Sequence, residues 1–342
     1  MSLDDVINSM NKKAKEEVVS AGLPAYDFTR IPFTSPRMNY CTFGGIPTGK
    51  LIEFFGEEHG GKTTTALDII ANYQRLPNAK KVMYIDAENT LDAEWAKKLG
   101  VDLDSGSFIC FKPTSQSAED IFQFILDAMT SGELGLWVLD SIPALSSAQE
   151  LDKTMEEKTY CGISGPLTVF SRKAEKLMQK YDCTGIGINQ VRDDLGAMWA
   201  GAVKTPGGKA WKHFCAVRMQ FTKGKYIDAK GNELTQKAES PAGNYVVMSM
   251  VKNKSCPPTR RTGFYTLNYE CGIDYLKDLV DLAIKYGVID KSGAWYSILD
   301  AETGEQLEKL QGIASVYSYL EDEANEEVLT KIENYIDSQI LI

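Results

Sequence analysis

The stretch GEEHGGKTTT, which begins at Gly56, constrains the fold of this chain more than any other. Glycines weaken a helix or a strand from within, so this segment is expected to form a loop between the strand-length run LIEFF and the helical run TTTALDII. It fits the pattern G-x-x-x-x-G-K-[ST] with Gly56, Gly61, Lys62 and Thr63. The backbone N–H groups of such a loop surround a phosphate chain, and the following helix directs its positive N-terminus at the same place. Lys62 would reach the β- and γ-phosphates and Thr63 would ligate Mg²⁺, so the loop predicts a P-loop nucleotide site.

Two further strand-length runs end in acidic residues. The run LGLWVLDS ends in Asp140, where a carboxylate can hold the water shell of Mg²⁺; a helix cap is the alternative for an Asp in this position. The run KVMYIDAEN ends in Asp86 and Glu88. Hydrolysis needs a carboxylate that polarises water against the γ-phosphate, and Glu88 is the candidate base, with a solvated loop acid as the alternative. Because strand ends in an open α/β sheet share one edge, these acids are expected beside the P-loop.

Strand-length runs alternate with helical patterns from about residue 50 onward. This alternation predicts a parallel sheet that is covered by helices on both faces. Later runs have no helices between them, which predicts antiparallel strands that extend the sheet. The expected parallel strands are 51–55, 81–88, 108–112, 134–141 and 184–191, the antiparallel ones 216–225, 244–254 and 263–269, and the helices 63–76, 91–100, 117–132 and 166–181.

The two ends of the chain differ from this central pattern. Residues 3–20 have apolar side chains at helical spacing, which predicts an amphipathic helix that docks on a neighbouring subunit or packs on its own domain. From about residue 274 the pattern becomes helical again. We therefore predict an α/β protein: a P-loop NTPase core with a mostly parallel central sheet flanked by helices, an N-terminal helical arm and a small α-rich C-terminal domain. The expected limits are 1–30, 31–270 and 271–342.

Composition narrows the cellular setting. No apolar run approaches the roughly 18 residues needed to span a bilayer, and the N-terminus lacks the apolar core of a secretion signal. The seven cysteines are odd in number and scattered without a C-x-x-C, and the two histidines argue against a structural zinc site. These features predict a reduced, cytoplasmic compartment and no membrane partner.

The net charge of −10 is unevenly distributed. Residues 301–342 contain ten acidic and two basic residues, a net charge of −8, so the first 300 residues together carry only −2. Within them, 189–225 holds seven basic residues against two acidic ones, and 252–261 holds four basic residues and no acidic ones. The overall acidity therefore does not exclude a nucleic-acid partner, because basic patches exist away from the acidic end.

These segments occur in an order that resembles the RecA recombinases, bacterial or bacteriophage. The most specific matches are VKNKSCPP and GIDYLKDLVDLAIKYGVIDKSGAWYS, and the stretches around the P-loop, YIDAENTLDAEWAKKLGVD, LWVLDSIPAL, IGINQVR and GGKAWKHFCAVRMQ also match. The N-terminal arm and the last 40 residues match loosely. The resemblance implies a RecA-like core, DNA repair and a part in the SOS response.

The resemblance also implies roles at the nucleotide site. Glu88 would be the catalytic glutamate, and Gln190 would sense the γ-phosphate and pass that state to the loop after it. Asp92 and Trp95 would flank the adenine, with Trp95 in place of the usual Tyr. Lys252 and Lys254 would reach into the ATP site of a neighbouring subunit. The ATP-binding residues would be Gly56, Glu57, Glu58, His59, Gly60, Gly61, Lys62, Thr63, Thr64, Asp92, Trp95 and Asp140, with Thr63 and Asp140 at the Mg²⁺ and Lys62, Glu88 and Gln190 in catalysis.

DNA binding in this family lies in two loops, which correspond here to about 157–165 and 191–209. The second is rich in glycine and lacks periodicity, so we expect a mobile loop whose basic residues meet phosphates and whose Met-Trp pair wedges between or stacks on bases. An unstructured surface loop is the alternative. Asp193 and Asp194 add negative charge, Gly165 stands near a usual arginine, and His213 replaces an aromatic residue linked to cooperativity. The DNA-binding residues would be Arg172, Arg192, Met198, Trp199, Lys204, Gly207, Gly208 and Lys209.

These features predict an ATP-dependent recombinase. Subunits would assemble head-to-tail into a helical filament on single-stranded DNA, pair it with duplex DNA and exchange strands while hydrolysing ATP. A hexameric helicase or DNA motor is one alternative, since it shares the core but forms closed rings. An ATP-controlled regulatory adaptor that does not recombine is another. The acidic end would repel DNA, so removal of 301–342 is expected to strengthen DNA binding.

Overall fold

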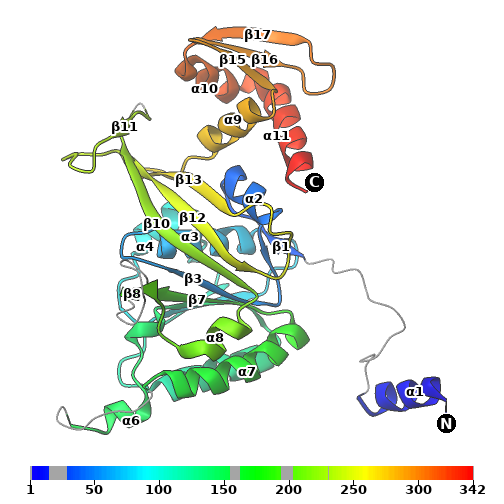
Figure 1. The fold of residues 1–342 in the computed structure, drawn as a ribbon, viewed down its shortest axis with the longest axis vertical. Helices are drawn as coiled ribbons and strands as arrows, with labels where there is room; N and C mark the ends of the chain where they lie inside the picture. Colours follow the sequence, from blue (N-terminus) through cyan, green and yellow to red (C-terminus); the bar gives the residue numbers. More distant parts are fainter. Residues whose placement is uncertain (1, 15–28, 155–161, 194–202, 230, 342) are drawn as a thin grey trace.

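The computed structural model describes residues 2–14, 29–154, 162–193, 203–229 and 231–341 (Figure 1). Its centre is a ten-stranded sheet with the order β14-β13-β12-β10-β3-β7-β6-β4-β5, in which β11 also pairs with β10. The strands from β10 to β5 in this order are mutually parallel. The bounds are β3 Leu51–Gly56, β4 Lys81–Asp86, β5 Phe108–Phe111, β6 Leu134–Asp140, β7 Thr184–Gln190 and β10 Val217–Ile227.

The expected strand ends do share one edge. Gly56 of β3 stands opposite Gln190 of β7 and Phe221 of β10, and Asp86 of β4 stands opposite Asp140 of β6. The parallel strands predicted at 51–55, 81–88, 108–112, 134–141 and 184–191 are confirmed, with ends that differ by a few residues.

Helices cover both faces of this sheet, as predicted. Alternate residues of each strand face opposite sides: Ile52 and Phe54 enter one apolar core, and Leu51 enters the other. The first core is closed by α3 (Lys62–Gln74) and α4 (Ala93–Lys98), and the second by α5 (Ala118–Thr130), α7 (Ser164–Tyr181) and α8 (Gly208–Phe214). Between α5 and α7 lie the short helices η1 (Ile142–Ala144) and α6 (Ala148–Leu151).

The later strands extend the sheet in antiparallel fashion. β12 (Gly243–Asn253) pairs with β10 and with β13 (Thr262–Asn268), and β14 (Gly272–Ile273) completes this edge. β11 (Glu233–Leu234) folds back on the far end of β10. The strands predicted at 216–225, 244–254 and 263–269 are present, and the last two extend the sheet in antiparallel fashion as predicted, whereas the first, β10, runs parallel to β3 and is antiparallel to β11 and β12.

The C-terminal region has a core of its own that lies beyond β13 in Figure 1. Helices α9 (Tyr275–Lys285), α10 (Ile313–Glu321) and α11 (Glu326–Ile340), with the short turn η2 (Glu323–Asn325), surround a three-stranded antiparallel sheet. Its strands are β15 (Ile289–Ser292), β16 (Trp295–Leu299) and β17 (Gln306–Gln311). The helices were expected, but the sheet was not, because its strands are short and the outer two, β15 and β17, are largely charged or polar.

The acidic end is part of this folded unit rather than a tail. Ile332, Ile336 and Ile340 of α11 are buried with Val316 and Leu320 of α10. Removing 301–342 would expose the remainder of this core, so the truncation expected to test the acidic charge would also unfold the region that carries it. Substitution of exposed acids is the cleaner way to change the charge.

The N-terminal region contains one helix and a small strand pair. Helix α1 (Leu3–Ala14) lies apart from the body in Figure 1, and Leu3, Val6 and Met10 are exposed on it. Residues 15–20 of the predicted helix lie outside the described part of the chain. β1 (Arg30–Ile31) pairs with β2 (Ile46–Pro47), and α2 (Pro36–Thr42) lies between them and packs on β13. None of the described helices is both long and apolar enough to cross a membrane. The limits 1–30, 31–270 and 271–342 stay a prediction.

Candidate functional site

The glycine-rich loop joins β3 to α3 where the strand ends meet. Gly56 has a φ of 151°, and a Cβ there would lie 2.0 Å from the carbonyl oxygen of Phe221. Gly61 has a φ of 93°, and a Cβ there would lie 2.8 Å from both methyl groups of Val246. Both positions therefore require glycine. In the described part of the chain no side chain caps α3, so its first N–H groups remain directed at the loop, where an anion binds well.

Lys62 is held by the loop itself. Its Nζ donates to the carbonyl oxygens of Gly56 at 3.1 Å and Glu57 at 2.6 Å. Burial lowers the pKa of the Lys62 ammonium, and the carboxylates of Asp140 and Glu88 oppose this shift. A mostly buried cation whose hydrogen bonds within the described residues are both to neutral carbonyls is suited to exchange one of them for a phosphate oxygen.

Thr63 and Asp140 lie together, as the sequence predicted. The Thr63 hydroxyl donates to Asp140 Oδ2 at 2.7 Å, and the Tyr84 hydroxyl donates to the same oxygen at 2.7 Å. Burial raises the pKa of Asp140, although these two hydrogen bonds act in the opposite direction. Hydroxyl and carboxylate oxygens suit Mg²⁺, and no described group of three or more His, Cys, Asp or Glu side chains could hold a metal alone. This pair therefore fits a Mg²⁺ that is held mainly by phosphates and water.

Glu88 and Gln190 also meet. Gln190 Nε2 donates to Glu88 Oε1 at 3.5 Å, and the Ser141 hydroxyl forms a short hydrogen bond to the same oxygen. Glu88 follows β4, Ser141 follows β6 and Gln190 ends β7, so three adjacent strands bring the three side chains together. The arrangement places a carboxylate beside the phosphate loop and connects it to the strand that leads into the segment from 191 onward. Sequence reasoning did not single out Ser141.

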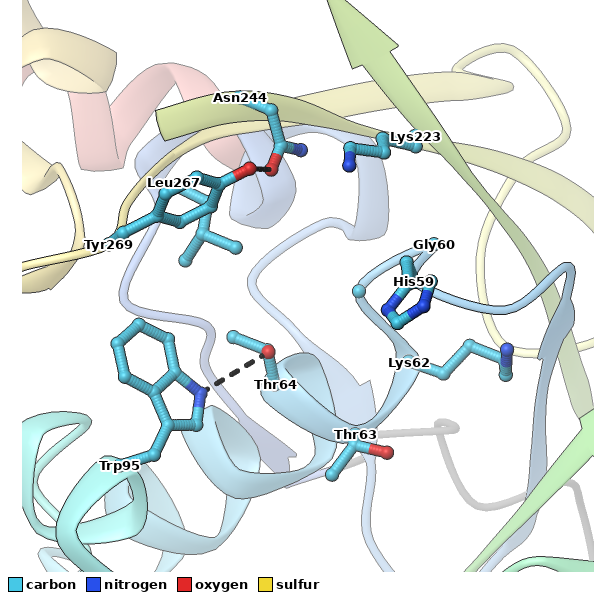
Figure 2. A pocket seen from close by; sticks show the side chains of 11 residues that line it. His59, Gly60, Lys62, Thr63, Thr64, Trp95, Lys223, Asn244, Leu267 and Tyr269 are labelled. Carbon is cyan, nitrogen blue, oxygen red and sulfur yellow. Dashed lines mark hydrogen bonds between the residues drawn. The ribbon is translucent and has the colours of Figure 1, made fainter. Parts of the chain in front are cut away.

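A cavity of about 520 Å³ opens beside the loop. Figure 2 shows Trp95 of α4 on one side and Tyr269 with Asn244 on the opposite side. Trp95 Nε1 donates to Thr64 Oγ1 at 3.4 Å, and Tyr269 OH donates to Asn244 Oδ1 at 2.7 Å. Two aromatic side chains that face one cavity next to a phosphate loop suit a nucleobase and its sugar. The lining residues are His59, Gly60, Gly61, Lys62, Thr63, Thr64, Trp95, Lys223, Asn244, Leu267 and Tyr269.

Four of these residues were missed by the sequence analysis: Lys223, Asn244, Leu267 and Tyr269. Phe221 stands opposite Gly56, so Lys223, two residues further along β10, extends past the end of β3 toward the cavity. This follows only once β10 is known to lie next to β3, and no local spacing in the sequence indicates it. His59, expected to be a variable loop side chain, has a φ of 57° and lines the cavity.

The remaining ATP-site candidates lie at the rim. Asp92 Oδ1 accepts from the backbone N–H groups of Glu94 at 2.9 Å and Trp95 at 3.1 Å, so it caps α4 and holds Trp95 in place. Its side chain does not line the cavity described above. Glu57 and Glu58 are exposed on the loop.

Lys252 and Lys254 lie far from their own phosphate loop. Lys252 of β12 stands opposite Arg218 of β10. Gly56, where the phosphate loop begins, stands opposite Phe221, which is three residues further along β10. Lys252 Nζ donates to the carbonyl oxygens of Lys212 at 2.7 Å and His213 at 2.8 Å, near the C-terminal end of α8. Lys254 is exposed at the end of β12. Neither lysine is among the residues that line the cavity beside the loop of its own subunit.

The predicted DNA-binding residues fall on several elements. Arg172 is exposed on α7. Arg192 of β8 (Arg192–Asp193) pairs in register with Lys204 of β9 (Val203–Lys204), so the second loop has a hairpin stem. The expectation of a mobile loop through Lys209 is wrong at its C-terminal end: Gly207 caps α8, and Gly208 and Lys209 lie in that helix. The sequence did not predict this helix for two reasons. It begins with two glycines of positive φ, Gly207 and Gly208, and its seven residues are too few to show an apolar periodicity. Met198, Trp199 and residues 157–161 of the first loop lie outside the described residues, and the loop's last two residues, 164 and 165, begin α7.

Comparison with known families decides the relationship. A family description of the RecA N-terminal domain matches residues 5–274, and one of the RecA C-terminal domain matches residues 277–341. The chain belongs to the RecA family.

Individual RecA proteins agree with this assignment. The chain is 33% identical to Protein RecA of Ruminococcus albus over 91% of its own length and 73% of that protein. It is 33% identical to Protein RecA of Thermus aquaticus over 99% of its length and 96% of that protein. It is 36% identical to Protein RecA of a Nitratiruptor species over 86% of its own length and 79% of that protein. Membership of the RecA family supports a recombinase function with DNA repair, and at family level it supports nucleotide binding, a DNA-dependent ATPase, DNA binding and oligomerisation.

Proposed function

We propose that this protein is an ATP-dependent recombinase that assembles into a helical filament on single-stranded DNA and exchanges strands with a homologous duplex. One observation carries the proposal: Gln190, whose side chain contacts the candidate base Glu88, lies two residues before Arg192, which is in the stem of the second predicted DNA loop. A γ-phosphate that binds Gln190 would thus act on the strand that leads to the DNA grip. A cytoplasmic location follows from a DNA substrate.

The nucleotide would be ATP with Mg²⁺. The N-terminal amides of α3 and Lys62 would bind its phosphates, and the base would lie between Trp95 and Tyr269. Thr63 and Asp140 would hold Mg²⁺, which neutralises phosphate charge when bound. Glu88 would accept a proton from the attacking water, with Ser141 holding its carboxylate in place.

Filament formation would complete this site. Lys252 and Lys254 lie at the end of β12 remote from their own loop, and we infer that they would serve the ATP of a neighbouring subunit in the manner of arginine fingers. Such head-to-tail contacts do not close, and they generate a helical filament. Helix α1, with Leu3, Val6 and Met10 exposed, would dock on the neighbour.

DNA would be gripped by its backbone. Arg192, Lys204 and Lys209 would meet phosphates, and Arg172 would add a contact from α7. Phosphate contacts carry no sequence information, so little sequence preference is expected and homology would be read by base pairing. The exposed acids of α10 and α11 would oppose this grip.

An ATP-dependent strand-exchange assay on single-stranded and homologous duplex DNA tests the proposal. The unmodified protein should exchange strands and Lys62→Ala should not. Lys81→Ala is the matched control, because Lys81 lies on β4 and forms a surface ion pair with Glu133. Strand exchange by Lys62→Ala as well as by the unmodified protein would contradict the mechanism. An unmodified protein that exchanges no strands but keeps its DNA-stimulated ATPase would contradict it too. The second result, with closed rings in electron micrographs and duplex unwinding, would indicate a helicase; without unwinding it would indicate a regulatory adaptor.

A further inference from the structure

A buried carboxylate lies behind the nucleotide site, outside the chemistry described so far. Glu53 is in the middle of β3, the strand that ends in the phosphate loop, and it is fully buried. Its Oε1 accepts from Asn189 Nδ2 at 2.8 Å, and its Oε2 forms a short ion pair with Arg218 Nε. Burying a charge is costly unless it is paired and hydrogen-bonded, so a fold that retains this carboxylate must satisfy it fully.

The sheet register explains how these three side chains meet. Arg218 of β10 stands directly opposite Glu53, and Asn189 of β7 stands opposite Phe55, two residues further along β3. Alternate strand residues share a face, so all three side chains lie on the face covered by α7 and α8. Arg218 also lies over the Phe55 ring, with 4.7 Å between its Cζ and the ring centroid.

The cluster continues to the segment that closes the second DNA loop. Asn189 Nδ2 donates to the carbonyl oxygen of Pro206 at 3.1 Å, and Arg218 Nη2 donates to the hydroxyl of Thr205 at 3.3 Å. Thr205 follows Lys204 directly, and Lys204 pairs with Arg192 in the hairpin stem. The buried cluster therefore holds the C-terminal side of the stem at the two residues after β9.

The cluster also touches the strand end that carries Gln190. Asn189 Oδ1 accepts from the backbone N–H of Gln190 at 3.0 Å. The Asn189 carboxamide thus makes three hydrogen bonds: to the strand of the phosphate loop, to the residue that contacts Glu88, and to the end of the DNA-loop stem. A shift of Gln190 would change the position of this amide, and Pro206 would follow.

We propose that Glu53, Asn189 and Arg218 are positioning residues that couple the nucleotide state at Gln190 to the stem residues Arg192 and Lys204. The inference rests on the proposed function, because it assigns the regulation of that same DNA grip. Their role is to hold Thr205 and Pro206 in register with the end of β7. With this connection intact, the nucleotide state alters DNA affinity; without it, nucleotide still binds but DNA affinity no longer responds.

Two variants interrupt the connection without removing the buried charge. Thr205→Val keeps the side-chain volume and loses only the bond from Arg218. Asn189→Ala loses all three carboxamide bonds, to Glu53, to Pro206 and from the backbone N–H of Gln190. Thr42→Val is the matched control, because Thr42 is also a buried threonine with hydrogen bonds from and to backbone groups, and it lies on α2, away from the nucleotide and DNA residues. Melting temperatures of all variants report whether they fold.

The measurement is the ratio of single-stranded DNA affinity with a non-hydrolysable ATP analogue to that with ADP, together with nucleotide affinity and DNA-free ATPase rate. We expect Thr205→Val and Asn189→Ala to lower this ratio at least about fivefold, the lower end of typical coupling between sites, and Thr42→Val to leave it unchanged. Nucleotide affinity and the DNA-free ATPase rate should change less than about twofold. A general packing defect would lower these two quantities as well.

A double-mutant cycle with Gln190→Ala separates coupling from packing. If the signal passes from Gln190 through Asn189, then Thr205→Val should have no further effect on the ratio once Gln190 is replaced. Additive effects, or a folded Thr205→Val protein with an unchanged ratio, would overturn the inference. If the unmodified protein itself shows equal DNA affinity with both nucleotides, the proposed function fails, and this inference fails with it. Should Asn189→Ala not fold, Thr205→Val and its cycle still decide.

Discussion

Replacing Asp278 should remove a pH dependence that is built into the seam between the core and the C-terminal helices. Asp278 lies in the first turn of α9 and is fully buried. It accepts from the Ser35 hydroxyl at 2.5 Å and from the backbone N–H of Thr266 at 3.3 Å, and Arg37 lies 3.7 Å away. Burial raises the pKa of Asp278 from 3.8 to about 7, even though Arg37 and these hydrogen bonds act in the opposite direction.

The sign follows from proton linkage. The folded state binds the Asp278 proton more tightly than the unfolded chain, so this group favours folding fully below pH 4 and progressively less as the pH rises to 7. A folded pKa of about 7 against 3.8 corresponds to about 4 kcal/mol in total, of which about 3 kcal/mol is lost between pH 5 and pH 8. Asp278→Asn has a similar shape but does not titrate.

Urea denaturation at pH 5, 6, 7 and 8 measures this effect. The free energy of unfolding of the unmodified protein minus that of Asp278→Asn should fall by about 3 kcal/mol across the series. Asp281→Asn is the control, because Asp281 pairs with the same Arg37 but is 35% exposed. A difference for Asp278→Asn that stays constant within about 1 kcal/mol would refute this reasoning.

Three further predictions concern single contacts. Trp95→Ala should weaken nucleotide binding by about 1–3 kcal/mol in a fluorescent-nucleotide titration, since stacking on the base is lost, and Trp95→Phe should retain most of the affinity; equal loss in both would exclude stacking. Tyr84→Phe removes the 2.7 Å bond to the buried Asp140, so the free energy of unfolding in urea should fall by about 1.5–3 kcal/mol, and no change would show that water replaces it. Arg260→Met removes donors to the carbonyl oxygens of Ile340 and Tyr40, so hydrogen exchange near the end of α11 should accelerate, whereas unchanged exchange would show that apolar packing alone anchors this helix.

Local pattern was enough to predict the parallel half of the sheet and much of its chemistry. Gly56, Asp86, Asp140 and Gln190 each stand at the end of an apolar run, and parallel strands must bring such ends to one edge. The same rule brings Asp140 near the loop after β3, and the structure adds the hydrogen bond from Thr63, in the first turn of α3, to Asp140. The roles of those residues in ATP chemistry stay predictions.

Contacts across the antiparallel extension could not be predicted in this way. Asn244 and Tyr269 reach the cavity because β12 and β13 lie beyond β10, and that order depends on pairings between distant segments. The cluster around Glu53 was hidden for the same reason: a glutamate inside an apolar run gives no indication of Arg218, its partner on another strand. The small C-terminal sheet was missed because its strands are short and its two outer strands are largely polar or charged.

The central place of β3 has a consequence for how the chain folds. Its two neighbours in the sheet, β7 and β10, both lie well over a hundred residues further along the chain. Contacts of such long range form slowly, because the entropy of closing the intervening loops is lost before the contacts are made. A nascent chain must extend past Phe221 before the strand of the phosphate loop has both partners. The nucleotide site is therefore expected to form late, and added nucleotide should slow unfolding while it leaves the refolding rate nearly unchanged.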